Sequence, residues 1–304
     1  MDVLVTGSSG FIGSALVETL AETGHRPIRA VRTDRVPSGV DAIAWDPDAG
    51  KIDAGALEGI DGIVHLAGAG IGDKRWTDDR KRLIVESRTT PTRLLAETLA
   101  GLQRPPPVLV SGSAIGYYGD RADEPRDEGA PPGDDFVADV CVRWEAAARP
   151  AADAGIRLVT IRTGLVLGRG GGLLDRLLIP FRLGAGGRLG DGKQWMSWIS
   201  IEDEVDAILH ALRTPELSGP TNLTAPHPVT NAEFTRTLAR VLHRPAVLPT
   251  PLLPLKALYG EELVAHLLLA SQRVLPQRLT ASRFSFEHPT LEAALRALLR
   301  RDDA

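Results

Sequence analysis

The first thirty-two residues constrain the fold of this chain more than any other stretch. A short apolar run at residues 3–6 leads into a glycine-rich turn at residues 7–13, which opens a helical pattern that ends at Gly24. A second apolar run follows at residues 28–32. Strand, glycine turn, helix and strand in this order form the unit that binds dinucleotides in doubly wound α/β proteins.

The glycines of this turn have separate physical roles. Gly7 allows a tight turn, Gly10 lets the backbone approach a pyrophosphate, and Gly13 lets the helix pack close to the strand. The free N–H groups and the positive end of the helix dipole then face the phosphates. We therefore expect the cofactor to contact six residues of this turn, namely Gly7, Ser9, Gly10, Phe11, Ile12 and Gly13.

Composition limits the class of protein. With 304 residues, 43% of them hydrophobic, the chain can bury a large core as one big domain or two modest ones. A net charge of -4 gives no reason to expect nucleic acid or an anionic membrane as a partner. One cysteine excludes an internal disulfide and suggests a reducing compartment. Without a signal-peptide pattern or an apolar run of about 18 residues, we expect a soluble cytoplasmic protein.

Strand and helix patterns alternate through the first half of the chain. We expect further strands at residues 41–46, 63–68, 108–111 and 156–162. Helices are expected at residues 77–100, where Pro91 divides or kinks the helix, and at residues 136–154. This alternation predicts the α/β class, with a doubly wound parallel-sheet (Rossmann) domain and right-handed crossovers.

The regular alternation ends near Gly168. Further helices are expected at residues 173–183, 202–212, 231–242, 261–274 and 291–300, and an extended stretch at residues 195–201. We predict a nucleotide-binding core over residues 1–168. A smaller, mostly helical lobe over residues 169–304 is interleaved with this core and ends in a helical tail.

Several motifs together resemble the extended short-chain dehydrogenase/reductases. They lie at residues 6–13, 65–68, 118–119, 162–164 and 190–192. A closer resemblance is to an atypical subgroup described as NAD-dependent epimerases, or as cell-division-inhibitor-like proteins, at residues 74–77, 86–88, 116–120, 144–147 and 194–199. A helical C-terminal domain of unknown function in that subgroup is similar to the chain from about Leu252 onward. The resemblance implies further cofactor contacts at Asp46, Leu66, Ala67, Gly68, Arg88, Arg162 and Gly164.

The end of the second strand separates NAD from NADP. An acidic residue there binds the ribose 2′-OH of NAD, whereas an arginine accommodates the 2′-phosphate of NADP. The acidic position falls on Val31, and Arg32 follows at once, with Arg35 nearby. Because arginine binds phosphate bidentately, the sequence favours NADP(H) over NAD(H). Asp34 provides the competing interpretation, since its carboxylate could take the ribose hydroxyl.

The usual proton-transfer pair of the short-chain enzymes is absent. In those enzymes a tyrosine acts as acid or base, and a lysine four residues later lowers the tyrosine pKa. No Tyr-x-x-x-Lys occurs here, and the two positions fall on Val137 and Cys141. The usual serine or threonine position falls on Ala114, with Ser113 beside it. The arginine that clamps a nucleotide sugar's diphosphate falls on Met196, which argues against such a substrate.

A few polar and aromatic residues remain as candidates for chemistry. Tyr117 and Tyr118, with Ser113 assisting, are candidate proton donors, because they follow the strand that ends near the expected nicotinamide. The alternative for both tyrosines is aromatic packing of a glycine-rich loop. Four residues are candidates for a substrate pocket: Lys74, Gln194, Trp195 and Trp198. The alternative for Lys74 is a solvated side chain, and for the other three it is a hydrophobic contact between lobes. The seven histidines lack ligand spacing, so no metal is expected.

These observations leave three functions open. The first is an NADP(H)-dependent oxidoreductase that acts on an unknown small carbonyl or hydroxyl compound, with hydride supplied by the cofactor. The second is a non-catalytic NADP(H)-binding redox sensor or interaction protein, which the missing tyrosine and lysine motivate. The third is a nucleotide-sugar epimerase. The sequence does not specify the substrate or the oligomeric state, and a homodimer is compatible with it.

Overall fold

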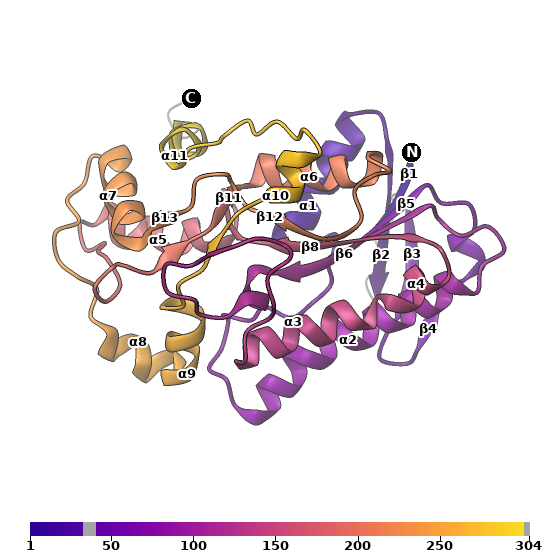
Figure 1. Ribbon diagram of the computed structural model, residues 1–304, viewed down its shortest axis with the longest axis horizontal. Coiled ribbons are helices and arrows are strands. Elements are labelled where there is room, and N and C mark those ends of the chain that lie inside the picture. The colour runs from indigo at the N-terminus through magenta and orange to yellow at the C-terminus, as the bar shows by residue number, and fades with distance from the viewer. Residues whose placement is uncertain (33–40, 301–304) are drawn as a thin grey trace.

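A mainly parallel sheet forms the centre of the protein (Figure 1). The computed structural model describes residues 1–32 and 41–300. Within these residues the sheet has eight strands in the order β12-β8-β6-β5-β1-β2-β3-β4, and all neighbours are parallel except β3 with β4. The strands are β1 (Asp2–Thr6), β2 (Arg26–Arg32), β3 (Ala42–Asp46), β4 (Lys51–Ile52), β5 (Gly62–His65), β6 (Val108–Ala114), β8 (Arg157–Thr163) and β12 (Gly219–Leu223).

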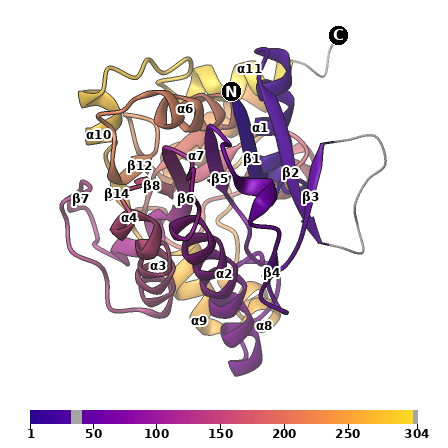
Figure 2. The ribbon, with the colours of Figure 1, turned by 90° about the vertical axis from the view of Figure 1, so that its right-hand side faces the viewer.

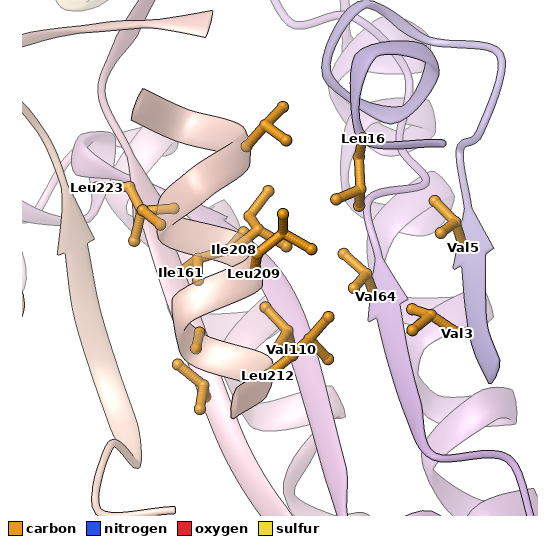
Figure 3. Close-up of a cluster of buried hydrophobic side chains, with 14 of the residues drawn as sticks. Val3, Val5, Leu16, Val64, Val110, Ile161, Ile208, Leu209, Leu212 and Leu223 are labelled. Atoms are coloured by element: carbon orange, nitrogen blue, oxygen red, sulfur yellow. The ribbon is translucent and has the colours of Figure 1, made fainter. Parts of the chain in front are cut away.

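Helices cover both faces of this sheet (Figure 2). One face carries α1 (Phe11–Glu22) and α6 (Ile201–Arg213), and the other carries α2 (Asp78–Ala100), α3 (Phe136–Ala147) and α4 (Arg149–Asp153). Because successive strand residues point to opposite faces, Val3 and Val5 join the α1 and α6 core, while Leu4 joins the core under α2. Figure 3 shows the first of these cores, where Leu16 of α1 and Ile208 of α6 meet the strand side chains.

This arrangement confirms the predicted doubly wound α/β fold, and two helices differ in detail. The expected break at Pro91 does not divide α2, which runs through that residue as one helix. Thr77 begins α2 by accepting a hydrogen bond from the N–H of Arg80. The single helix expected at residues 136–154 is divided into α3 and α4 next to Pro150.

The second half of the chain is built from short strands and helices around the sheet. Two short parallel pairs and one antiparallel pair occur: β9 (Leu165–Leu167) with β11 (Trp198–Ser200), β7 (Pro125–Arg126) with β14 (Arg273–Val274), and β10 (Trp195–Met196) with β13 (Val229–Thr230). The helices are α5 (Gly172–Arg182), α7 (Asn231–Leu242), α8 (Leu252–Tyr259), α9 (Glu261–Leu263), α10 (Gln277–Ala281) and α11 (Leu291–Arg300). None of the described helices is both long and apolar enough to span a membrane.

The helix expected at residues 261–274 is wrong in its second half. Helix α9 continues as a π-helical turn at Val264–Leu268, and the chain then leaves the helical conformation. The backbone instead forms hydrogen bonds with a segment that is distant in sequence. The N–H of Val274 donates to Ser197 Oγ at 2.8 Å, and the N–H of Gln272 donates to the Trp195 carbonyl at 3.1 Å. The same stretch forms β14 against β7, so the tail is tied to the loop that follows β6.

Candidate functional site

The turn between β1 and α1 has the shape that close approach of a ligand requires. Gly7 has a φ of +67°, and a Cβ on it would lie 2.9 Å from the carbonyl carbon of Leu66. A Cβ on Gly13 would clash with the carbonyl oxygen of Gly7, so α1 can pack this close only with glycine there. A Cβ on Gly10 would meet only that same oxygen, at 3.2 Å. Gly10 therefore leaves open space where a pyrophosphate is expected.

The other turn residues predicted to contact the cofactor have different surroundings. Ser9 is exposed, whereas Phe11 and Ile12 are half-buried against the core between the sheet and α1. The Phe11 ring packs under the glycine-rich segment after β9, where a Cβ on Gly168 would lie 2.7 Å from Phe11 Cζ. Phe11 thus supports the turn by packing, and the first N–H groups of α1 remain without a side-chain cap.

The residues that follow β5 lie beside this turn. Strand β1 lies between β2 and β5, and open α/β sheets bind ligands where the strand order reverses in this way. Leu66 and Ala67 are half-buried and Gly68 is exposed. The Arg88 side chain packs against Gly68, and its guanidinium lies 5.0 Å from the ring centroid of Trp144. Arg88 forms no ion pair with any described residue, and burial lowers the pKa of its guanidinium.

The end of β2 presents an exposed arginine. Arg32 Nη1 donates to Asp48 Oδ2 at 2.9 Å, and both side chains are more than half exposed. Sequence reasoning missed Arg29, whose Nη1 donates to the Ser8 carbonyl at 3.2 Å and thereby holds the glycine turn. Arg35 and Asp34, the other residues weighed in the cofactor prediction, lie outside the described residues.

Asp46 has a local role in the same region. Its Oδ1 accepts hydrogen bonds from the N–H groups of Asp48 and Ala49, both at 3.1 Å. These bonds fix the turn that joins β3 to β4. The carboxylate of Asp46 therefore orders the segment that carries Asp48, the present partner of Arg32.

A chain of hydrogen bonds between uncharged side chains lies beneath the glycine turn. Thr6 Oγ1 lies 2.7 Å from His65 Nδ1, and His65 Nε2 lies 2.8 Å from Thr92 Oγ1. Thr92 also accepts from Trp144 Nε1 at 3.1 Å. His65 is fully buried, and burial lowers its pKa to about 4, so the imidazole is neutral at pH 7. The chain links β1, β5, α2 and α3, and His65 is a packed residue rather than a base.

A charged network lies at the ends of β6 and β8. Arg162, which is 2% exposed, donates from Nε and Nη2 to the two carboxylate oxygens of Glu145 at 2.8 and 2.9 Å. Its Nη1 donates to the Tyr118 hydroxyl at 3.0 Å, and that hydroxyl donates to Asn222 Oδ1 at 2.7 Å. Ser113 Oγ donates to Glu145 at 2.8 Å. These groups come from β6, α3, β8, β12 and the 3₁₀ turn Ile115–Tyr118.

This network gives internal partners to three of the predicted site residues. Arg162 directs Nε and Nη2 to Glu145 and Nη1 to Tyr118, so each of its nitrogens has an internal partner. Tyr118 is fully buried, burial raises its pKa to about 12, and its proton is held by Asn222. Ser113 gives its proton to Glu145. Of the predicted proton donors, Tyr117 alone is half-buried with a hydroxyl that bonds to no described residue; the Arg162 guanidinium lies 3.4 Å from its ring centroid.

The face of α3 that would carry the tyrosine and lysine carries other residues. Val137, Cys141 and Glu145 follow one another at four-residue spacing and share this face. Val137 packs against Gly116, and burial raises the pKa of the Cys141 thiol to about 12, so no thiolate forms at pH 7. Sequence reasoning missed Glu145, for which the four-residue spacing from Cys141 was the available signal.

The four predicted substrate-pocket residues have different surroundings. Lys74 is exposed, and Gln194 is buried with its Nε2 donating to the Leu189 carbonyl at 3.3 Å. Trp195 is half-buried under the Arg273 guanidinium, which lies 4.5 Å from its ring centroid. Trp198 is fully buried in a hydrophobic core, and its Nε1 donates to the His227 carbonyl. Trp198 thus packs as a core residue of this cluster.

Two further features bear on ligands. A hollow of about 850 Å³ lies beside α1 and is lined by acidic residues, among them Glu18, Glu22, Asp206 and Glu287. A dinucleotide is anionic, so this hollow does not suit it. Within residues 1–32 and 41–300, no group of three or more histidine, cysteine, aspartate or glutamate side chains is placed to hold a metal ion.

Comparison with known proteins gives the family. Residues 3–223 match the NAD dependent epimerase/dehydratase family, and residues 250–298 match a domain of unknown function, DUF1731. The epimerase family protein Mb2239 of Mycobacterium bovis is 43% identical over 96% of each chain. The crystal structure of the human epimerase family protein SDR39U1 with NADPH is 37% identical, has a TM-score of 0.91 and matches 99% of each chain.

A second solved structure adds a different description. The nucleoside-diphosphate sugar epimerase from Corynebacterium glutamicum is 38% identical with a TM-score of 0.80, and the match covers 98% of this chain and 57% of that one. The resemblance inferred from the motifs is thus confirmed. This chain belongs to the NAD dependent epimerase/dehydratase family of the short-chain dehydrogenase/reductase superfamily, with a DUF1731 domain at its C-terminal end.

Proposed function

We propose that this protein binds NADP(H) in preference to NAD(H) and transfers hydride between it and a small carbonyl or hydroxyl compound. The observation that carries this proposal is the exposed Arg32 at the end of β2, beside a glycine turn with open space at Gly10. Arginine binds a 2′-phosphate bidentately, and Val31 stands where an NAD-binding acid is expected. The NADPH in the crystal structure of human SDR39U1 supports the same cofactor.

The charges around the turn suit an anionic cofactor. The Arg32–Asp48 pair is largely exposed, with 58% and 72% of the two side chains accessible, so it contributes only ~0–1 kcal/mol and can exchange its carboxylate for a phosphate. The uncapped N–H groups of α1 face the expected pyrophosphate. Arg88 supplies a partly buried cation that has no carboxylate partner among the described residues.

Of the three candidate proton donors after β6, one side chain is available to a substrate. The cofactor supplies hydride when it is bound. The protons of Tyr118 and Ser113 are held by Asn222 and Glu145, so we assign the substrate contact to Tyr117. The Arg162 guanidinium over its ring fixes its position at the end of β6.

The cofactor assignment is tested by Arg32→Ala. Loss of the phosphate contact is expected to weaken NADPH binding by roughly 10- to 100-fold, from about 1.5–3 kcal/mol for a hydrogen bond to a charged group, and to leave NADH binding unchanged. Isothermal titration with both cofactors measures this. Arg26→Ala is the matched control, because Arg26 lies at the other end of β2 and pairs with Asp2 and Asp41. Equal weakening of both cofactors by Arg32→Ala contradicts the assignment.

A second candidate function follows from Val137 and Cys141, which replace the usual tyrosine and lysine. It is an NADP(H)-binding sensor or interaction protein without catalysis. Consumption of NADPH with a panel of small carbonyl compounds distinguishes the two functions. Turnover supports the oxidoreductase, whereas absence of turnover together with capture of a partner only in the presence of NADPH supports the sensor.

A further inference from the structure

A fully buried carboxyl group lies at the carboxyl end of the sheet, on the face that α6 covers. Glu204, in the first turn of α6, is 0% exposed, and its Oε1 accepts a hydrogen bond from Thr163 Oγ1 at 2.8 Å. Its Oε2 is buried and has no hydrogen-bond partner among the described residues. Burial raises the pKa of Glu204 to about 8, against the effect of the Thr163 bond, so the neutral acid predominates at pH 7.

Thr163 connects this acid to the edge where ligands bind. It is the last residue of β8 and pairs with Ala114 of β6 and Leu223 of β12. Because strand residues alternate between faces, Arg162 points to α3 and Thr163 points to α6. Thr163 is half-buried whereas Glu204 is fully buried, so the pair leads from the core to the carboxyl ends of the strands.

The direction of the hydrogen bond fixes what Thr163 can bind. A threonine hydroxyl has one proton and two acceptor lone pairs. When the Thr163 proton is donated to Glu204, the hydroxyl can only accept toward the crevice. A phosphate or carboxylate oxygen is then excluded as its partner, and an N–H or O–H donor is required.

The strand order indicates which end of the cofactor lies here. Strand β2 with Arg32 lies on one side of β1, and β5, β6 and β8 follow on the other. Four strand spacings, about 19 Å at ~4.8 Å each, separate β2 from β8. A cofactor whose 2′-phosphate lies at Arg32 and whose pyrophosphate lies at Gly10 extends its nicotinamide end toward β6 and β8.

We propose that Thr163 accepts a hydrogen bond from the carboxamide N–H of the bound nicotinamide, and that Glu204 is a positioning residue that fixes the direction of the Thr163 proton. This inference rests on the proposed function, because it requires a nicotinamide cofactor in the crevice. It assigns a role to a buried acid that neither cofactor selectivity nor hydride transfer otherwise uses.

The test compares two ligands that differ at the nicotinamide end. NADPH carries the carboxamide, whereas 2′,5′-ADP carries only the adenosine end with its 2′-phosphate. Thr163→Val is expected to raise the Kd for NADPH about 10-fold, as for loss of one hydrogen bond, and to leave the Kd for 2′,5′-ADP unchanged. Thr221→Val is the matched control, because Thr221 is buried in the neighbouring strand β12 and lies two residues before its end.

Two variants of Glu204 test its positioning role. Glu204→Met removes the acceptor, frees the Thr163 proton and is expected to raise the Kd for NADPH about 3-fold. Glu204→Gln keeps an oxygen that can accept the Thr163 proton and is expected to keep the Kd for NADPH close to the wild-type value. Where Glu204→Met fails to fold, Thr163→Val and Glu204→Gln still decide the question.

Each outcome has a defined meaning. Equal weakening of NADPH and 2′,5′-ADP by Thr163→Val shows a structural role and overturns the inference. No weakening of either ligand also overturns it, while the selectivity of Arg32 for NADPH would still support the proposed function. If the wild-type protein binds neither ligand, the proposed function fails, and the inference fails with it.

Discussion

The carboxyl ends of β2 and β8 use arginine in opposite ways. At the end of β2, Arg32 is 58% exposed and pairs with an exposed Asp48. At the end of β8, Arg162 is 2% exposed and pairs with Glu145, which is 16% exposed. An exposed pair contributes ~0–1 kcal/mol, whereas removing one partner of a buried pair leaves a costly unpaired charge. The first arginine can therefore exchange its partner for a ligand, and the second cannot.

This difference bears on how the side chains at the ends of β6 and β8 are arranged, which we call the reaction side. The missing lysine would place a free cation beside a tyrosine, and Arg162 does place a cation beside Tyr117 and Tyr118. That cation is neutralised by a bidentate bond to Glu145, so it orders the tyrosines and Ser113 rather than binding a substrate. The cofactor side keeps its charge available, and the reaction side uses its charge for structure.

The largest expected effect comes from breaking the buried pair. Arg162→Met leaves Glu145 without its cation and removes the donor to Tyr118, so we expect the free energy of unfolding to fall by about 3–5 kcal/mol. Urea denaturation measures it. Replacing both partners, as Arg162→Met with Glu145→Met, is expected to recover part of the loss, because no unpaired charge remains. A loss below about 1 kcal/mol, the range of an exposed pair such as Arg32 with Asp48, refutes the contrast drawn between the two arginines.

The fold was predictable because its signals are local. The glycine turn and the apolar runs at residues 3–6, 63–65 and 108–111 each lie within a few residues of chain, and alternation of strand and helix fixes a parallel sheet. The prediction of a helix at residues 261–274 was wrong for the opposite reason. Its leucines favour a helix, but the backbone N–H of Val274 donates to Ser197 Oγ, 77 residues away in sequence, and so does not donate within a helix.

The reaction side was not predictable because its contacts are distant in sequence. Tyr118 and Asn222 are 104 residues apart, and Thr163 and Glu204 are 41 apart. No spacing rule brings such pairs together before the sheet has formed. The burial of Trp198 was not predictable for a related reason, since a tryptophan in an extended stretch fits a pocket and a core equally well until its burial is known.

A smaller effect is expected from the buried hydrogen bonds that join Thr6, His65 and Thr92. Burial lowers the pKa of His65 to about 4 from 6.5, so below pH 6.5 the unfolded chain binds a proton that the folded protein does not. The contribution of His65 to stability is therefore full above pH 6.5 and falls as the pH falls toward 4, by about 3 kcal/mol at ~1.36 kcal/mol per pKa unit. His65→Gln should remove this dependence, measured by urea denaturation between pH 4 and 7.

The matched control is His227→Gln, because His227 is exposed. It should keep the wild-type dependence on pH. The pKa of Glu204 is raised to about 8, so its ionisation changes stability in the opposite direction as the pH rises from 4.5 to 8. Glu204 is present in wild type and in both variants, and the difference between them isolates His65. If His65→Gln keeps the full dependence, the imidazole is not the buried neutral group that links β1 to α2.

The smallest effect in stability, and the most informative for the ligand, comes from the exposed pair. Asp48→Ala is expected to change the free energy of unfolding by less than about 0.5 kcal/mol, as for most surface substitutions. Because Arg32 then has no carboxylate to exchange, NADPH should bind up to about 3-fold more tightly, within the ~0–1 kcal/mol of a surface pair, with NADH unchanged. Asp2→Ala, which removes a partner of Arg26, should alter neither affinity. Weaker NADPH binding in Asp48→Ala would mean that Asp48 orients Arg32 toward the phosphate, and the exposed pair would then be a fixed part of the site like its buried counterpart.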